Sequence, residues 1–262
     1  MSLLYRLTRR LVNWRGGYRL SKLLIGYFGY SSPIEAEVLG NRMILDPQDH
    51  VCRSLLYYPQ IFDVEERAAL VPEIQEGDVF VDAGAHYGLY SLLAARRGAR
   101  VLSIEADPET FARLEHNIAI NRIQNIVAVN AGISDRPERL KLYRNEALGD
   151  RSGHSFVPGG GREDSVEVEC GPLPDIMAAH GFDRCDVLKV DVEGFEYRVI
   201  EPFLERSKHP PRIVFIEYYP RRNTGDILAL LQNHGYRLER KARANYLFRR
   251  GGEGNRTSVT GH

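Results

Sequence analysis

The stretch VFVDAGAHYG at residues 79–88 decides the fold of this chain. Its apolar start predicts a buried strand, and the glycines that follow predict a tight turn into a helix. Such a turn lets a ligand approach the backbone and presents the free N–H groups of the helix N-terminus to it. The spacing is G-x-x-x-G, without the third glycine of dinucleotide-binding proteins or the Lys-Ser/Thr pair of a P-loop. Because Asp82 at the strand end would repel a pyrophosphate, a cationic or amine-bearing ligand is expected.

Strand and helix patterns alternate around and beyond this stretch. Helical patterns separate buried strands, which are expected at 78–82, 101–105, 126–129, 187–192 and 213–218. The stretches 236–239 and 246–248 then predict a closing antiparallel hairpin. This order predicts an α/β, Rossmann-like fold with a mainly parallel central sheet and helices on both faces. Such sheets bind ligands at the carboxyl ends of their strands, near the point where strand order reverses.

The chain divides into three expected regions. Residues 1–77 form a helical and hairpin extension that packs on the core, residues 78–250 form the cofactor-binding domain, and residues 251–262 form a disordered tail. Residues 34–46 predict a short hairpin around Gly40-Asn41. An amphipathic pattern over residues 1–24 predicts a helix with a basic face. This helix either packs on the main domain or contacts a membrane surface or a lipid-linked substrate.

Glu105 ends the second expected strand, 21 residues after Gly84. A carboxylate at this place can accept hydrogen bonds from both hydroxyls of a ribose. An acid after a strand is weak evidence by itself, because solvated strand ends often carry one. Together with the glycine turn, Glu105 predicts a nucleoside-binding site.

The pattern D-x-G-x-x-x-G followed by this acid resembles the S-adenosylmethionine-dependent methyltransferases with the class I, Rossmann-like fold. Further segments resemble the FkbM-type family within them, namely IEADP at 104–108, NIAIN at 117–121, NAGISD at 130–135 and LKVDVEGFE at 188–196. The resemblance implies an O-methyltransferase that acts on a hydroxyl of a small molecule, sugar or glycan. It also implies cofactor contacts at Asp82, Gly84, Ala85, His86, Tyr87, Gly88, Glu105, Ala106, Asn130, Ala131 and Asp191.

The segment LKVDVEG at 188–194 is informative on its own. It would place Lys189, Asp191 and Glu193 on one side of an extended strand, and buried charges need partners. Asp191 is the first candidate for the base that takes the hydroxyl proton, with Lys189 and Glu193 in the same catalytic group. The alternative is a structural salt bridge from Lys189 to Asp191 or Glu217. Asp191, Glu193 and Glu217 could hold a divalent metal, but an ordinary acid-lined cleft also explains them, and no metal is assigned.

His154 lies in the glycine-rich stretch 149–162 and is the second candidate for the base, because histidine titrates near neutral pH. The glycines around it suit a loop that closes over substrate. A solvated loop histidine is the alternative.

The formal net charge is zero, with 35 Lys+Arg and 35 Asp+Glu, but the charge is unevenly distributed. Residues 1–34 carry +6, residues 237–250 carry +5, and residues 35–236 carry −11. Net neutrality argues against a nucleic-acid-binding protein. The two basic segments could contact an anionic or lipid-linked acceptor, or a second copy of the chain in a homo-oligomer.

Three widely spaced cysteines without a C-x-x-C pair indicate neither a disulfide framework nor a zinc site. With no signal-peptide pattern and no long apolar window, a cytoplasmic location is expected. Two other functions remain open. One is a binding module that keeps the fold without catalysis, and the other is a nicotinamide-dependent oxidoreductase, which the missing third glycine disfavours.

Overall fold

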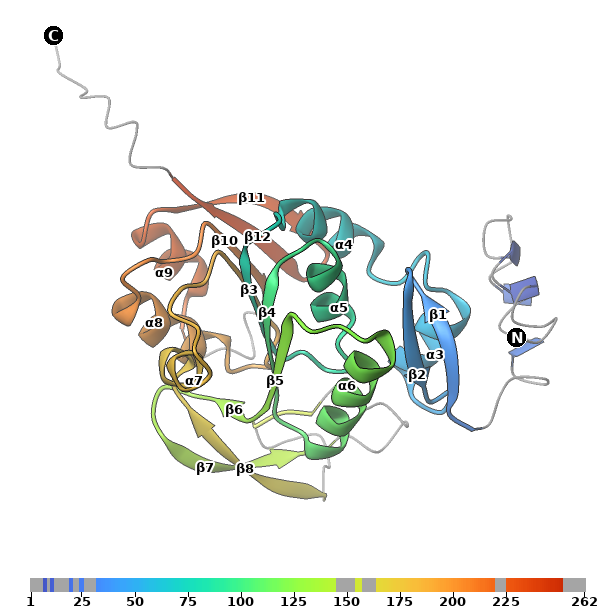
Figure 1. The fold of residues 1–262 in the computed structure, drawn as a ribbon. Helices are drawn as coiled ribbons and strands as arrows, with labels where there is room; N and C mark the ends of the chain where they lie inside the picture. Colours follow the sequence, from blue (N-terminus) through green and yellow to red (C-terminus); the bar gives the residue numbers. More distant parts are fainter. Residues whose placement is uncertain are drawn as a thin grey trace, which may run out of the picture.

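A seven-stranded sheet forms the centre of the computed structural model (Figure 1). The structure describes residues 32–144, 154–156, 164–219 and 225–251, and the pairs 7–8, 10–11, 19–20 and 24–25. The strand order is β11-β12-β10-β9-β3-β4-β5. The bounds are β3 (Val79–Ala83), β4 (Arg100–Glu105), β5 (Ile126–Asn130), β9 (Val187–Val190), β10 (Ile213–Glu217), β11 (Tyr236–Ala242) and β12 (Asn245–Arg250). Strands β10, β9, β3, β4 and β5 are parallel, and β12 pairs antiparallel with β10 and β11. The predicted parallel sheet and closing hairpin are confirmed.

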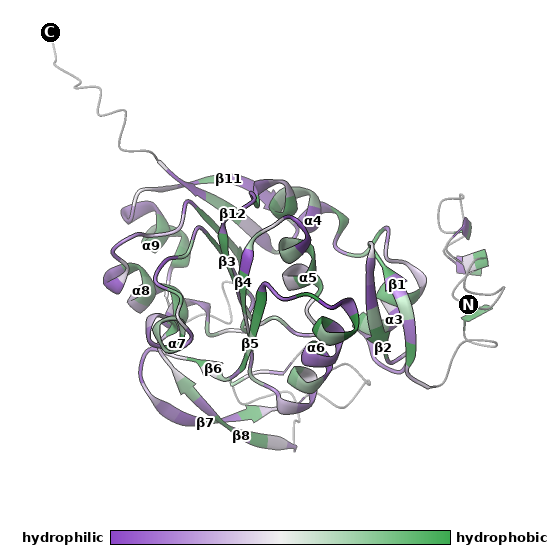
Figure 2. Cartoon of the chain, in the orientation of Figure 1, coloured by the Kyte–Doolittle hydropathy of each residue, from purple (hydrophilic) through white to green (hydrophobic). Residues whose placement is uncertain are grey.

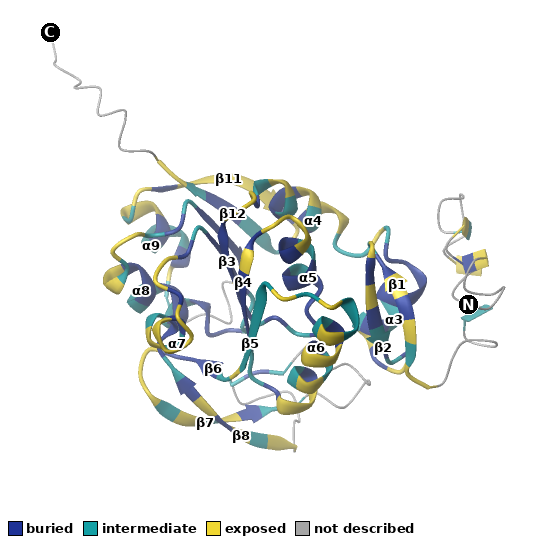
Figure 3. Cartoon of the chain, viewed as in Figure 1, coloured by how far each residue is buried: buried dark blue, intermediate teal, exposed yellow. Residues whose placement is uncertain are grey.

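Helices cover both faces of this sheet (Figure 1). One face carries α4 (Val64–Leu70), α5 (Leu89–Arg96) and α6 (Pro108–Asn121), and the other carries α7 (Leu173–Ala179), α8 (Glu196–Arg206) and α9 (Ile227–Asn233). Figures 2 and 3 show the central strands as largely apolar and buried, with the polar, exposed residues on the outer sides of the helices. Helix α6 begins at Pro108, because the side chain of the preceding Asp107 accepts a hydrogen bond from Thr110 N.

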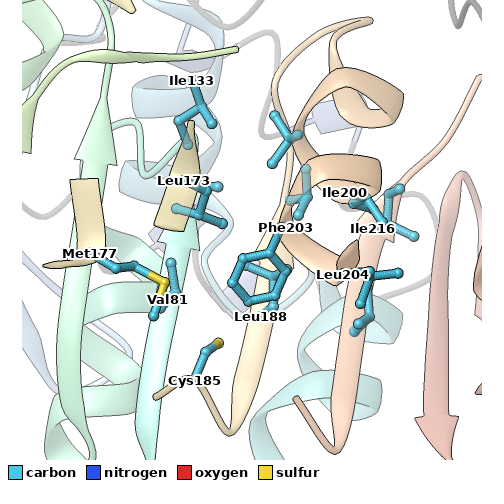
Figure 4. Close-up of a cluster of buried hydrophobic side chains, with 14 of the residues drawn as sticks. Val81, Ile133, Leu173, Met177, Cys185, Leu188, Ile200, Phe203, Leu204 and Ile216 are labelled. Carbon is cyan, nitrogen blue, oxygen red and sulfur yellow. The ribbon is translucent and has the colours of Figure 1, made fainter. Parts of the chain in front are cut away.

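Alternation along the strands divides the core between the two faces. Val81 and Leu188 pack with the helices α7 and α8, as Figure 4 shows. Phe80 and Val187, one residue earlier in each strand, pack instead with α4 and α5. By the same alternation Asp82, Lys189 and Glu217 lie on the α4–α5 face, at the carboxyl ends of β3, β9 and β10.

The N-terminal hairpin packs beside α6. It consists of β1 (Ile34–Val38) and β2 (Asn41–Leu45), and the helix α3 (His50–Tyr57) and the short 3-10 helix η1 (Val71–Glu73) follow along the chain. Asn117 on α6 accepts a hydrogen bond from Ile44 N at 2.8 Å and donates to Tyr87 O at 3.0 Å. This asparagine therefore links the hairpin to the glycine turn.

Most of residues 1–24, with the predicted basic helix, and residues 252–262, with most of the predicted tail, lie outside the described residues.

A smaller three-stranded sheet lies beside the carboxyl ends of the central strands. It contains β6 (Gly132–Ile133), β7 (Glu138–Tyr143) and β8 (Ser165–Gly171), in the order β6-β8-β7. Exposed and more buried residues alternate along both β7 and β8. Most of the predicted glycine-rich loop, residues 149–153 and 157–162, lies outside the described residues. No helix in the described ranges has the length and apolar character needed to cross a membrane.

The strand order reverses between β3 and β9. The chain runs from β3 to β4 and β5 on one side, and β9 and β10 then continue on the other side of β3. Gly84 follows β3 at this point with φ of +82°, and a Cβ there would lie 1.8 Å from the carbonyl oxygen of Asp191. Only glycine fits, because the atom that it would meet belongs to the backbone of the neighbouring chain segment.

We predict that Gly84→Ala destabilises the protein far more than Gly40→Ala. Gly40 has nearly the same φ, +81°, but a Cβ there meets nothing within 4 Å. Both variants bear the cost of a left-handed alanine, about 1–2 kcal/mol, and only Gly84→Ala adds the steric overlap, for about 1–3 kcal/mol or more. Urea unfolding measures both values, and equal losses would contradict the tight contact with Asp191.

Candidate active site

A cavity of about 180 Å³ opens at the carboxyl ends of β3, β4 and β9. Apolar side chains from α3, β6, β7 and the segment 154–156 form part of its wall. The predicted site residues that line it are Gly84, Ala85, His86, Tyr87, Glu105, Ala106, Ala131, His154, Lys189, Asp191 and Glu193. Asp82, Gly88 and Asn130 do not line it. The structure therefore brings most of the predicted site residues together around one cavity, and three of them have other surroundings.

Asp82 and Lys189 form a buried ion pair across β3 and β9. They are partners in the strand register, and Lys189 Nζ lies 3.1 Å from Asp82 Oδ1 and 3.7 Å from Asp191 Oδ2. Asp82 also accepts a hydrogen bond from Ser91 on α5, and Lys189 donates to Gly84 O at 3.1 Å. Burial lowers the pKa of Lys189, but the charges of Asp82 and Asp191 outweigh this and raise it. The structural salt bridge considered from the sequence is present, with Asp82 as its closest partner.

The first three residues of the glycine turn use their N–H groups within the protein. Gly84 N and Ala85 N donate to Ile104 O at 3.0 and 2.9 Å. His86 N donates to Glu105 Oε2 at 2.8 Å. The turn is thus fixed to the end of β4, and it presents the Glu105 side chain rather than bare backbone.

Glu105 is held as a rigid acceptor. Its Oε1 accepts a second backbone hydrogen bond, from Asp107 N at 2.9 Å, and each oxygen keeps a further lone pair. Burial raises the pKa of Glu105 to about 7, although the two backbone donors oppose this. His86 beside it has φ of +51°, and burial lowers its pKa to about 4, so its ring is neutral at pH 7. No described residue hydrogen-bonds to His86 Nε2, which leaves a buried polar atom that a ligand can satisfy.

Gly88 and Asn130 have structural positions. Gly88 precedes α5 with φ of +86°, and a Cβ there would come within 2.5 Å of Leu114. Asn130 is exposed, and its amide donates to Glu105 O at 2.8 Å and to Ala106 O at 3.0 Å. Both residues therefore support the turns that form the site without lining the cavity.

Asp191, Glu193 and Glu217 come together, but not for the predicted reason. Strand β9 ends at Val190, two residues earlier than expected, and Glu193 lies in a turn with φ of +52°. Asp191 and Glu193 therefore do not follow Lys189 along one side of a strand, as expected. One carboxylate oxygen from each of Asp191, Glu193 and Glu217 nevertheless lies within 4.8 Å of the others. Burial, followed by the charges of Asp191 and Glu193, raises the pKa of Glu217 to about 9.

A second cavity of about 210 Å³ adjoins the first, and Asp63, Tyr90, Lys189 and Asp191 line both. Asp63 precedes α4 but makes no side-chain cap, and instead accepts a hydrogen bond from Tyr90 at 3.3 Å. Burial and the charge of Glu66 raise its pKa to about 6. Sequence analysis missed Asp63, Glu66 and Tyr90, because acids at the start of a helix are ordinary. The positive φ of Asp63 is visible only in the structure.

His154 lies in the wall of the first cavity and is not solvated. Its side chain is 10% exposed, and Nδ1 lies 3.9 Å from Asp107 Oδ2. The adjacent Ser155 pairs with Tyr143 through two backbone hydrogen bonds and donates from Oγ to Glu193 O at 2.7 Å. These contacts hold His154 over the cavity, where it can reach a bound molecule.

We predict that Lys189→Met lowers the free energy of unfolding by about 3–5 kcal/mol, because it leaves the carboxylate of Asp82 buried without its cation. The double variant Asp82→Asn/Lys189→Met should recover most of this loss, since neither charge remains. Urea unfolding of the single and double variants measures the coupling. A single variant as stable as the natural chain would show that the pair does not stabilise the fold.

The first cavity fits S-adenosylmethionine. A ribose can donate to Glu105, the cationic portion can lie near the carboxylate of Asp191, and His86 Nε2 offers a further polar contact. Lys189, the lysine that lines the cavity, is already paired with Asp82, so a phosphate finds no free lysine here.

Comparison with known proteins agrees with this fit. The sequence model of the Methyltransferase FkbM domain matches residues 82–238, more than half of the chain. Methyltransferase sdnD of Sordaria araneosa is 28% identical over 202 residues, which cover 65% of this chain and 78% of that protein. The 31-O-demethyl-FK506 methyltransferase FkbM of Streptomyces tacrolimicus is 28% identical over 197 residues, 63% of this chain and 74% of that protein.

Among solved structures, M. jannaschii TYW2 in complex with AdoMet matches 85% of this chain and 89% of that chain, with 16% identity and a TM-score of 0.45. The family match and the sheet topology together identify the cofactor as S-adenosylmethionine. The chain belongs to the FkbM methyltransferase family, whose members are S-adenosylmethionine-dependent enzymes with the Rossmann-like class I fold.

Proposed function

We propose that this methyltransferase transfers a methyl group to a hydroxyl oxygen of a small molecule or of a sugar in a glycan. The observation that carries the proposal is that Asp191 borders both cavities. Its side chain is 38% exposed, whereas Asp82 has no exposed side-chain surface. Asp191 is thus a carboxylate that a molecule in either cavity can reach.

In this proposal the first cavity holds the cofactor and the second receives the acceptor. When bound, S-adenosylmethionine supplies an electrophilic methyl group, whose bonding electron pair returns to sulfur as the new C–O bond forms. Asp191 accepts the proton that the hydroxyl oxygen loses, which makes the oxygen a better nucleophile. Lys189, 3.7 Å away, holds the Asp191 carboxylate in position. Most of the rate would come from this positioning of the two reactants.

The acids of the second cavity bear on the acceptor. Asp63, Glu66, Asp191 and Glu217 line it, against Lys189 and Arg243. An anionic group at the reacting end would meet this negative charge, so a neutral, hydroxyl-rich end such as a sugar ring is favoured. The name of the Streptomyces relative, 31-O-demethyl-FK506 methyltransferase, describes an oxygen acceptor for that protein and supports oxygen here.

We predict that Asp191→Asn lowers kcat by at least about 100-fold and leaves the affinity for S-adenosylhomocysteine within a few-fold of the natural value. His154→Gln is the matched variant for the second candidate base. Incubation with mono- and oligosaccharides, followed by mass spectrometry for one added methyl group and NMR to locate it, measures transfer. Methyl groups on nitrogen or carbon would reject a hydroxyl acceptor, and an active Asp191→Asn variant beside an inactive His154→Gln variant would make His154 the base.

We predict that the affinity for S-adenosylhomocysteine rises roughly tenfold from about pH 6 to about pH 8. Burial raises the pKa of Glu105 to about 7, and the ionised form accepts hydrogen bonds from ribose hydroxyls best. Below pH 7 the carboxyl must therefore lose a proton when the ligand binds. Calorimetric titration across this range measures the effect, and Glu105→Gln should bind weakly with no such dependence. A natural affinity that stays constant or falls with pH would exclude this role.

A further inference from the structure

Three carboxylates meet where the two cavities join. Asp191, Glu193 and Glu217 each offer one oxygen, and these oxygens lie within 4.8 Å of one another. When ionised, carboxylates at this distance repel one another. The ammonium of Lys189 lies 3.7 Å from Asp191, but it also serves Asp82 and Gly84 O. Three carboxylate oxygens this close together form a compact set of acceptors for a cation.

Glu66 on α4 gives a second, independent observation. Its residue surface is 4% exposed, and it lines the same cavity as Asp191 and Glu217. Among the described residues, none hydrogen-bonds to its Oε2. Its Oε1 lies 3.8 Å from Nε of Arg243, whose side chain is 61% exposed. A buried acceptor without a donor is costly, so the cavity lacks a donor at this place.

The cavity has room for an occupant that supplies what is missing. Its volume of about 210 Å³ holds an ion and several water molecules. Ionised carboxylates only accept hydrogen bonds, so the occupant must bring positive charge, donors, or both. A hydrated divalent cation brings both, because its bound water molecules donate.

We propose that one Mg²⁺ or Mn²⁺ ion binds to Asp191, Glu193 and Glu217, and that a water molecule on the ion donates to Oε2 of Glu66. Carboxylate oxygens are the ligands that these hard cations prefer. Three carboxylates, each through one oxygen, leave half of an octahedron open for water or for an acceptor oxygen. The three ligands include no thiolate or imidazole, which separates the site from the usual zinc centres.

The binding of the ion is independent of the proposed function, whereas its catalytic role depends on it. An acceptor hydroxyl that replaces a bound water becomes more acidic on the ion and is fixed beside the first cavity. Its proton passes to the oxygen of Asp191 that does not bind the ion. The oxygen then forms its bond to the methyl carbon as the bond from that carbon to sulfur breaks.

Electron paramagnetic resonance of free Mn²⁺ tests the site, in the presence of S-adenosylhomocysteine and without any acceptor. We expect one Mn²⁺ per chain. Glu193→Gln and Glu217→Gln should each raise the Kd at least about 100-fold, and Glu66→Gln about 10-fold, as for groups that hydrogen-bond to a ligand of the metal. Glu169→Gln is the matched control and should not change the Kd, because Glu169 is 79% exposed on β8 and pairs with Arg139.

Thermal unfolding separates metal loss from misfolding. Glu217→Gln keeps the size and polarity of the side chain, so without metal it should be about as stable as the natural chain, while Mn²⁺ raises the Tm of the natural chain alone. Absent Mn²⁺ binding, or full binding by Glu193→Gln and Glu217→Gln, would overturn the proposal. Methyl transfer that continues in EDTA would overturn the catalytic role. Bound Mn²⁺ with methylation at nitrogen or carbon would instead count against the hydroxyl acceptor.

Discussion

The buried pair of Asp82 and Lys189 is the interaction on which the rest of the site depends. It joins β3 to β9 where the strand order reverses, and neither charge can be left alone without a large cost. The same ammonium reaches Gly84 O and Asp191, and Asp82 reaches Ser91 on α5. The glycine turn, the first cavity and the exposed carboxylate are therefore all fixed relative to one ion pair.

The site concentrates acids on a chain with no net charge. Glu105 is held by two backbone donors, and Asp191 is held by Lys189. Within the described part of the chain, Glu105 is thus held without a cation beside it, whereas Asp191 shares the ammonium of Lys189 with Asp82. Burial resists the ionisation of Glu105 and Glu217, which is why the pKa of Glu105 is raised to about 7 and that of Glu217 to about 9. The binding of positive charge and the loss of protons are coupled here.

The local parts of the site could be predicted from sequence, and the long-range parts could not. The glycine turn and Glu105 belong to one strand–helix–strand unit, so their spacing alone brings them together. Glu66 and Glu217 lie on α4 and β10, more than a hundred residues apart. They line one cavity only because α4 packs on the face of the sheet on which Glu217 lies. Period-two alternation failed at Glu193, where the backbone turns at φ of +52°. A solvated histidine was the alternative for His154, but its side chain is 10% exposed and lies 3.9 Å from Asp107.

The hydrogen bonds around the segment 154–156 have a consequence for the sequence changes that this chain can accommodate. Arg144 N donates to Asp164 O at 2.9 Å, and Tyr143 and Ser155 exchange backbone hydrogen bonds of 2.9 and 3.1 Å. The described residues that flank 145–153 and 157–163 are thus fixed to one another. Changes of sequence between these flanking residues would leave the hydrogen bond from Ser155 to Glu193 O in place. Evolution or protein engineering can then change residues that contact an acceptor without changing the residues that hold the cofactor and the proposed base.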